Sequence, residues 1–243
     1  MILGLKVLAL IPARGGSKGL PRKNVLSLAG KPMVAWSIDA AKNSRYVDEV
    51  VVSTDNEEIA SVSKQHGANV PFMRPAHLAE DGSTTIDVAL HTVEQLPDYD
   101  ILVILQPTSP LRLSEDIDQT IERMIDANTT SAVTVTEPAK SPFWSYTLEQ
   151  DGRLQTLIDD ELAVKRRQDL PDAYVLNGAV YTICIEEMLK CKCFVSEDTV
   201  ANIMPPNRSL DIDTEFDFKL VEFYMQETDY PSNNNMPHIV AAT

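Results

Sequence analysis

Short runs of apolar residues alternate along the chain with longer segments in which apolar residues recur every three or four positions. The short runs predict buried strands, and the periodic segments predict helices that cover them. The expected strands are residues 5–11, 49–53, 69–72, 101–105, 131–136 and 174–184. The expected helices are residues 32–43, 56–66, 84–96, 114–127 and 214–226, with Ser114 as an N-cap. This alternation is typical of an α/β fold with a mostly parallel sheet flanked by helices.

The alternation breaks at about Pro138, where an aromatic group, Phe143, Trp144 and Tyr146, precedes an Asp-Gly turn signal at residues 151–152. We therefore expect a nucleotide-binding core of residues 1–137 and 176–227, an insertion of residues 138–175, and a weakly ordered tail of residues 228–243. A thin insertion cannot bury these aromatic side chains by itself, so a second copy of the chain is the expected cover. The alternative is that they pack back on their own sheet.

Charge narrows the classes of partner. The chain has 21 basic and 36 acidic residues, a net charge of −15, which disfavours nucleic acid and anionic membrane surfaces as partners. Residues 1–38 carry six Lys and Arg residues but no Asp or Glu, so one end of an acidic protein attracts anions. No apolar run approaches the roughly 18 residues of a membrane span, and no secretory signal is evident. We expect a cytoplasmic protein in which Cys184, Cys191 and Cys193 are reduced thiols.

The basic end contains a loop, residues 12–24, directly after the first expected strand. Ligands of open α/β sheets bind beyond the carboxyl ends of the strands, so the loop lies at the right edge. Gly15, Gly16 and Gly19 let the main chain approach a phosphate, and the surrounding cations can neutralise a triphosphate. The spacing matches neither the dinucleotide fingerprint nor the P-loop. The loop predicts a polyphosphate site; a flexible, solvated basic loop is the alternative.

A second candidate lies near the carboxyl end, at residues 211–213, with the sequence Asp-Ile-Asp. In an extended strand, both carboxylates would lie on one face, roughly 7 Å apart along the chain. Magnesium prefers a few carboxylates together with phosphate oxygens and water, so Asp211 and Asp213 are candidate Mg²⁺ ligands, for one ion or for two. The alternative for Asp213 is a plain N-cap of the helix that follows.

These segments together resemble the acylneuraminate cytidylyltransferases, the CMP-sialic acid synthetases. The resemblance covers residues 7 to about 225 and is carried by the loop and by residues 53–55, 74–75, 106–112, 166–168 and 177–178. It implies a Rossmann-like nucleotidyltransferase fold with a small dimerisation insertion, CTP as donor, an acidic nine-carbon sugar as acceptor, and Mg²⁺ as cofactor. It also implies a homodimer in which each insertion reaches the site of the other subunit.

The same resemblance assigns roles to residues. The nucleotide would be bound by Arg14, Gly15, Ser17, Lys18, Lys23, Asn24, Arg74 and Ser83. The acceptor would be bound by Gln106, Lys140, Arg166, Gln168, Tyr174 and Asn177. Arg14, Lys23, Asp211 and Asp213 would carry the catalysis. Related synthetases for an eight-carbon acid place an acidic residue where Gln106 stands, which favours the nine-carbon branch.

Several alternatives stay open at this level. N-acetylneuraminate, legionaminate and pseudaminate are all possible acceptors, and the general base is not evident, because none of the four histidines falls in a recognised motif. Another nucleotidyltransferase with a different nucleotide or acceptor would share the basic loop. A non-catalytic regulator would bind CTP without releasing pyrophosphate, but the two carboxylates argue against it.

Overall fold

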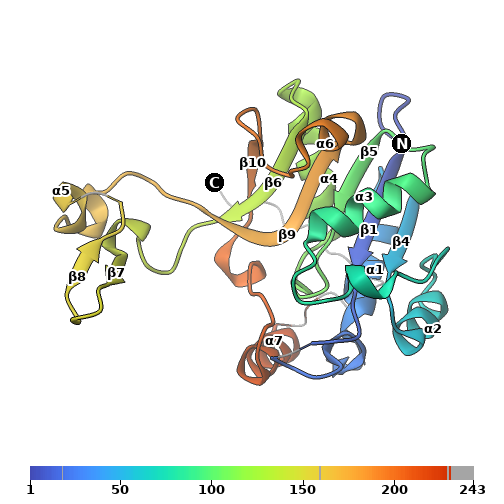
Figure 1. Cartoon of the computed structure of the whole chain (residues 1–243), viewed down its shortest axis with the longest axis horizontal. Coiled ribbons are helices and arrows are strands. Elements are labelled where there is room, and N and C mark those ends of the chain that lie inside the picture. Colours follow the sequence, from blue (N-terminus) through green and yellow to red (C-terminus); the bar gives the residue numbers. More distant parts are fainter. Residues whose placement is uncertain (18, 159, 229, 231–243) are drawn as a thin grey trace.

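The computed structural model describes residues 1–17, 19–158, 160–228 and 230. A six-stranded sheet with the order β10-β6-β9-β5-β1-β4 forms its centre (Figure 1). These strands are β1 (Val7–Pro12), β4 (Glu49–Ser53), β5 (Ile101–Ile104), β6 (Ser131–Thr136), β9 (Val175–Cys184) and β10 (Val200–Ile203). Neighbouring strands are parallel except at β9, which pairs antiparallel with both β5 and β6. The mostly parallel α/β sheet is confirmed.

Helices cover both faces of this sheet. The α-helices of the core are α1 (Met33–Lys42), α2 (Glu57–Gln65), α3 (Thr85–Gln95), α4 (Ser114–Asp126), α6 (Ile185–Cys191) and α7 (Glu215–Glu227). Single turns of 3-10 helix are η1 (Lys23–Val25), η2 (Ala76–Leu78), η3 (Pro142–Trp144), η4 (Arg167–Asp169) and η5 (Pro206–Arg208). Among the described residues, none of the helices combines the length and apolar character needed to cross a membrane.

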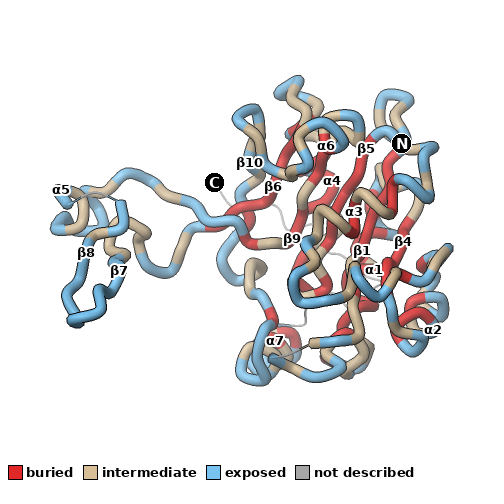
Figure 2. Tube along the Cα trace, in the orientation of Figure 1, coloured by how far each residue is buried: buried red, intermediate tan, exposed pale blue. Residues whose placement is uncertain are grey.

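The alternation of side chains in β1 shows how the two layers form. Val7, Ala9 and Ile11 pack on one face with residues of α1, α2 and α4. Leu8 and Leu10 pack on the other face with residues of α3 and α6. Because successive side chains of a strand point to opposite faces, a fully apolar strand can serve both layers. Figure 2 shows the buried strands as the centre of the core.

The insertion contrasts with this core. Its hairpin consists of β7 (Tyr146–Leu148) and β8 (Leu154–Thr156), with Gly152 at φ 85° in the turn, and a short helix α5 (Asp160–Ala163) follows. Figure 1 shows the insertion apart from the central sheet and connected to it by two linking segments without helix or strand structure. None of the described residues in 138–175 is buried (Figure 2). The predicted hairpin is confirmed, and the alternative that the aromatic group packs on its own sheet is wrong.

Several local predictions need correction. Residues 69–72 form no strand: only Asn69 and Met73 make isolated bridges to the β4 segment. Ser114 is the first residue of α4 rather than its N-cap, because the N-cap Leu113 donates its backbone N–H to Asp116. The end of β9 leads into α6, and β10 follows, neither of which was expected. Apart from residues 228 and 230, the predicted weakly ordered tail lies outside the described residues.

The thiol prediction also fails for two of the three cysteines. Cys191 and Cys193 form a disulfide across one intervening residue, whereas Cys184 is a free thiol. Burial raises the pKa of the Cys184 thiol, and the nearby glutamates Glu187 and Glu186 add to the effect. The three cysteines therefore form one disulfide and one free thiol, a division that their odd number did not indicate.

Candidate active site

A cleft of about 380 Å³ lies beyond the carboxyl ends of β1 and β5. It is the place where an open α/β sheet binds its ligand. Its basic and polar lining consists of Arg14, Ser17, Lys23, Asn24, Arg74, Ser83, Thr84, Thr85, Gln106 and Thr108. Its acidic lining consists of Glu80, Asp81 and Asp213.

Main-chain contacts to the neighbouring strand fix the start of the basic loop. The backbone N–H of Ala13 donates to the carbonyl of Ser53 over 3.0 Å, and that of Gly15 donates to Asp55 Oδ1 over 2.9 Å. A side chain at Gly15 would bring its Cβ within 2.9 Å of Asn56 Cβ. Only glycine fits this close approach. The hydrogen bonds to Ser53 and Asp55 explain why the resemblance includes residues 53–55 together with the loop.

The next residues hold Arg14 at the cleft. The Asn24 side chain, which is buried, donates from Nδ2 to the carbonyl of Arg14 over 2.9 Å. The Arg14 guanidinium contacts Asp81 at 3.2 Å and the carbonyl of Ala79 at 3.4 Å. Asn24 thus supports the loop from behind, while the charge of Arg14 faces a partly exposed acidic partner that an incoming anion can replace.

Lys23 connects the basic loop with the Asp-Ile-Asp segment of residues 211–213. Its Nζ donates to the carbonyl of Ile212 over 2.9 Å and lies 3.2 Å from Asp213 Oδ1. A Cβ at Gly19 would lie 2.2 Å from the carbonyl oxygen of Asp213, so the loop also meets this segment without room for a side chain. A basic residue near position 20 and an acidic residue near position 210 therefore share one corner of the cleft.

Arg74 supplies a buried positive charge. The residue is 6% exposed, and its guanidinium donates to the hydroxyl and the carbonyl of Ser53. Burial lowers the pKa of Arg74 to about 10. The negative charge of Asp55 opposes this decrease, and the positive charge of Arg14 adds to it. The group stays protonated at neutral pH. The cleft therefore holds a desolvated cation that forms no salt bridge with a carboxylate of the described residues, a favourable arrangement for binding phosphate.

Gln106 follows β5, and its Nε2 donates to Thr85 Oγ1 over 3.4 Å. Its backbone is fixed by Arg112, a fully buried residue that donates to the carbonyls of Gln106 and Ala179 over 3.2 and 2.6 Å. Burial lowers the pKa of Arg112 to about 10. The arginine of the 106–112 motif therefore positions the turn, and it lies outside the residues that line the cleft.

The two candidate metal carboxylates flank a buried anchor. Ile212 is fully buried, and its N–H donates to the carbonyl of Thr108 over 2.9 Å, whereas Asp211 and Asp213 are exposed. The predicted alternation is present, but the segment is extended chain rather than a strand. Although Asp211 as a residue is exposed to solvent, partial burial of its carboxylate raises its pKa; the charge of Asp213 adds to this rise, and a hydrogen bond from Thr108 opposes it.

This donor set fits one kind of metal site. Within the described ranges, no group of three His, Cys, Asp or Glu side chains forms a complete protein cage for an ion. Magnesium at nucleotide sites uses one or two carboxylates and takes its other ligands from phosphate and water. Asp213 at the cleft wall, with Asp211 two residues away, matches that requirement. Asp213 is also not the helix cap, because Thr214 accepts from the N–H of Asp217 in that role.

The structure brings together most of the residues predicted to bind the nucleotide. Those that line the cleft are Arg14, Ser17, Lys23, Asn24, Arg74 and Ser83, with Gln106 and Asp213 beside them. Gly15 lies in the same loop. Lys18 lies outside the described residues.

Five of the residues predicted to bind the acceptor lie elsewhere. Lys140, Arg166, Gln168 and Tyr174 are exposed residues of the insertion and are not among the described residues that line the cleft of their own chain. Asn177 is 8% exposed, and its amide bonds to Thr134 and Ser209 over 2.6 and 2.9 Å. Asn177 therefore ties β9 to its neighbours in this single chain.

Sequence reasoning missed Asp55 as the anchor of Gly15, and it missed the acidic wall of Glu80 and Asp81. The signal for Asp55 was present, because a Ser-Thr-Asp segment directly follows a buried strand. Glu80 and Asp81 follow η2 in an irregular segment without periodicity, so only the folded chain places them.

Comparison with known structures agrees with this geometry. The fold is similar to that of a CMP:2-keto-3-deoxy-manno-octonic acid synthetase complexed with CTP, with a TM-score of 0.69 and 17% identity over 91% of this chain and 99% of that one. It is also similar to a 4-diphosphocytidyl-2C-methyl-D-erythritol synthase from Anaerococcus prevotii, with a TM-score of 0.65 and 14% identity over 92% and 99% of the two chains. Both confirm the nucleotidyltransferase fold.

Curated relatives are more similar in sequence. A CMP-N,N'-diacetyllegionaminic acid synthase of Legionella pneumophila is 36% identical over 91% of this chain and 97% of that protein. A pseudaminic acid cytidylyltransferase of Campylobacter jejuni is 33% identical over 90% and 95% of the two chains. An N-acylneuraminate cytidylyltransferase of Streptococcus agalactiae is 37% identical over 88% of this chain, which spans 52% of that longer protein.

The family model described as cytidylyltransferase matches residues 8–194, a range that contains the basic loop, Arg74 and Gln106. With the fold, the cleft and the relatives in agreement, the chain belongs to the cytidylyltransferase family of nucleotidyltransferase enzymes.

Proposed function

We propose that this cytidylyltransferase transfers CMP from CTP to the anomeric hydroxyl of an acidic nine-carbon 2-keto sugar and releases pyrophosphate. The observation that carries the proposal is the convergence of Arg14, Lys23 and Arg74 on one cleft with Asp213 at its wall. A triphosphate needs such positive charge, and a carboxylate is needed to hold its counter-ion. The three acids named for the relatives are the candidates for the acceptor.

In this reaction the sugar hydroxyl attacks the α-phosphorus in line, and pyrophosphate leaves on the opposite side. Phosphoryl chemistry of this kind depends on positioning and on neutralising charge rather than on covalent catalysis. Arg74 would bind the phosphates from a fixed, buried position, and Arg14 would exchange Asp81 for the nucleotide. Lys23 would stabilise the negative charge that develops on the leaving pyrophosphate.

We further propose that Mg²⁺ is the cofactor and that Asp211 and Asp213 hold it. When bound, the ion offsets phosphate charge and polarises the phosphoryl oxygens. Lys23, 3.2 Å from Asp213 in the structure, would then turn from the carboxylate to the nucleotide. Among the described residues that line the cleft there is no histidine to act as general base.

Gln106 supports an acidic nine-carbon sugar as the acceptor in this proposal. It stands at the end of β5, where its amide can donate to and accept from sugar hydroxyls without adding charge next to an anionic substrate. We rank N-acylneuraminate first and keep legionaminate and pseudaminate as alternatives. A pyrophosphate-release assay that pairs each acid with CTP, ATP, GTP and UTP tests the proposal: we expect release only with CTP and at least one of the acids. Equal release with ATP or GTP would contradict it.

We also propose a cytoplasmic homodimer in which the insertion completes the partner's site. The insertion exposes Arg166 and several large apolar side chains, among them Val164 at 84% exposure and Leu148 at 71%. Apolar area of this kind is normally covered by a partner, and an exposed arginine suits the carboxylate of an acceptor. Nucleic acid and membrane have no place in this proposal.

A further inference from the structure

A second cavity adjoins the cleft and is separate from the proposed phosphate site. It has a volume of about 330 Å³ and is lined by Thr85, Gln106, Tyr181, Cys193, Phe194 and Val195. Thr85 and Gln106 also line the cleft, so the two spaces meet at the proposed acceptor residue. Half of this cavity wall is one loop segment, residues 193–195.

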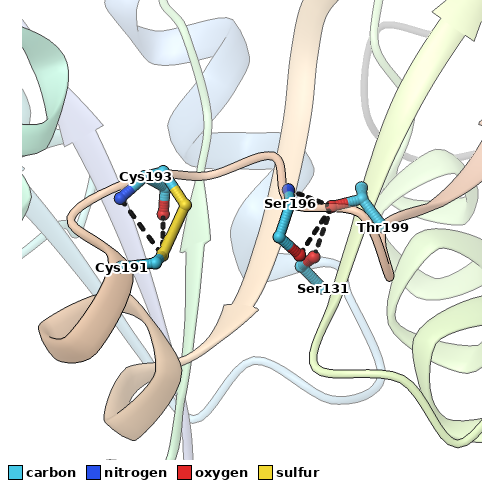
Figure 3. The surroundings of a disulfide bond; sticks show 5 residues. All are labelled: Ser131, Cys191, Cys193, Ser196 and Thr199. Carbon is cyan, nitrogen blue, oxygen red and sulfur yellow. Dashed lines mark hydrogen bonds between the residues drawn. A yellow bond between two sulfur atoms is a disulfide. The ribbon is translucent and has the colours of Figure 1, made fainter.

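That segment is held at both ends (Figure 3). At one end, Cys193 is joined to Cys191, the last residue of α6, by the disulfide, and the N–H of Cys193 lies 3.2 Å from Cys191 Sγ. At the other end, Thr199 Oγ1 accepts from the N–H of Ser196 over 2.7 Å and lies 2.7 Å from Ser131 Oγ at the start of β6. The disulfide is therefore one of two anchors of the cavity wall.

Between the anchors, Phe194 reaches Tyr181 of β9, with ring centroids 5.7 Å apart. Burial raises the pKa of Tyr181, and the negative charge of Asp211 adds to this effect. Movement of Phe194 would change the cavity on the side that Gln106 faces, because aromatic side chains in small pockets set shape by packing.

We propose that Cys191 and Cys193 form a reversible oxidation site that sets the shape of the cavity beside Gln106 and thereby the affinity for the acceptor. The inference rests on the proposed function, which makes this cavity the acceptor side. Disulfides of cytoplasmic proteins are usually transient and redox-responsive, so a pair at the wall of a binding cavity suits such a role. The disulfide holds the wall as the structure shows it, and the dithiol releases its α6 end.

The chemistry balances with a small-molecule disulfide as oxidant. One cysteine thiolate attacks the reagent, forms a mixed disulfide and expels a first thiolate. The second cysteine then attacks the protein sulfur of that mixed disulfide, and the second thiol leaves. The protein loses two protons and two electrons, and the oxidant takes up both. A dithiol reverses the exchange.

The experiment compares the enzyme after treatment with glutathione disulfide and after treatment with dithiothreitol, with the redox state checked by the mass of the 185–199 peptide. We expect the KM for the acidic sugar to differ at least about five-fold between the two states, while the KM for CTP stays the same. The double variant with Cys191→Ser and Cys193→Ser should give the KM of the reduced enzyme in both treatments, because neither position can then form a mixed disulfide. Cys184→Ser, the control, should respond as the wild type does, because this half-buried thiol lies outside the cavity.

Hydrogen exchange separates this inference from the proposed function. Amides of residues 192–196 should exchange faster in the reduced wild type than in the oxidised protein, whether or not any acid supports turnover. Equal exchange and equal KM values in two states of proven redox composition would overturn the inference and leave the proposed function standing. Altered exchange without turnover for any acid would refute the proposed function, and the effect on acceptor affinity with it.

Discussion

The cleft and the insertion show two ways in which a chain can build a binding surface. In the cleft, Arg14 pairs with Asp81 and Lys23 pairs with Asp213 of the same chain, and the backbone is fixed to buried strands. In the insertion, Arg166 pairs with its neighbour Asp169 and is 76% exposed, and none of the described residues in 138–175 is buried. The cleft residues therefore hold one another within one chain, whereas the insertion remains exposed, which is why we propose that a partner subunit covers it.

The cleft and the insertion also differ in how far apart in the sequence their contacting residues lie. Interactions within the cleft join residues up to 190 positions apart, so the core must fold before the site exists. In the insertion, the Trp144 indole donates to the carbonyl of Lys165 over 3.0 Å, a contact between two residues of the insertion itself. A single chain therefore defines the nucleotide half of the proposed site, and in our proposal the acceptor half is completed by a second subunit.

The largest effect should come from the cleft. Lys23→Ala or Arg14→Ala should lower turnover by a factor of about 10² or more, because these cations stabilise negative charge on the phosphates and do not contribute to core packing. Steady-state kinetics with CTP and the acid would measure the change, and circular dichroism would confirm the fold. Lys219→Ala is the matched control, since that lysine is 70% exposed on α7 and pairs with Glu215 on the same helix. Turnover near normal in both cleft variants would remove the basic loop from the mechanism.

The next effect concerns the metal. Asp213→Asn should raise the Mg²⁺ concentration needed for half-maximal rate and lower turnover by about ten-fold or more, because a neutral amide is a poor magnesium ligand. Asp211→Asn should act in the same direction. A titration of rate against Mg²⁺ measures both. An Asp213→Asn enzyme with an unchanged Mg²⁺ profile would refute the assignment, since Thr214, not Asp213, caps the helix.

Arg74 should separate binding from stability. Arg74→Met should weaken CTP binding by about ten-fold, because a desolvated cation is lost. Burial lowers the pKa of Arg74 to about 10, below the usual range of an arginine, so the buried charge destabilises the fold below about pH 10, and this penalty disappears as the pH rises above that value. The variant should therefore keep or raise the Tm without nucleotide. Calorimetry and thermal melts measure the two effects; tighter CTP binding, or a large loss of Tm, would contradict the account.

Subunit mixing tests the incomplete surface. Arg166→Ala and Lys23→Ala proteins, each of low activity, should recover about one quarter of wild-type activity when mixed in equal amounts, because half of the dimers are mixed and each has one intact site of two. Mass spectrometry would confirm exchange of subunits. Proven exchange without recovered activity, or an active monomer in sedimentation, would show that the insertion serves no partner.

The smallest effect lies in the local structure of α7. Thr214 accepts from the N–H of Asp217 over 3.2 Å and forms a capping box with it. Thr214→Ala should lower the free energy of unfolding by about 1 kcal/mol, the usual value of such a cap. Denaturant unfolding measures the change, and Thr228→Ala at the other end of the helix is the comparison. A loss above about 3 kcal/mol would mean that Thr214 supports more than the cap.

The elements that could be predicted are those with local signals. Glu49–Ser53 and Ser131–Thr136 match the expected strands because continuous apolar runs bounded by polar residues leave few alternatives. The antiparallel direction of β9 could not be predicted, because a strand buried on both faces has the same pattern in either direction. The strand predicted over residues 69–72 is an isolated bridge at Asn69, because a short apolar run does not specify its pairing.

The site divides in the same way. The glycines and cations of residues 12–24 predict a phosphate loop from their own chemistry, and the cleft forms around them. Asn177 shows the limit, because an amide that supports the sheet and an amide that binds a sugar look alike in sequence. The disulfide was missed because two cysteines one residue apart carry no signal of their oxidation state.

Direct detection of the product tests the central claim. In a mixture of CTP, MgCl₂, N-acetylneuraminate and the enzyme, phosphorus NMR should show the triphosphate signals replaced by pyrophosphate and by one phosphodiester signal from CMP joined to the sugar. Legionaminate or pseudaminate in place of N-acetylneuraminate would identify the acceptor. Loss of CTP to CMP or CDP without a phosphodiester, or no change with any of the three acids, would contradict the account.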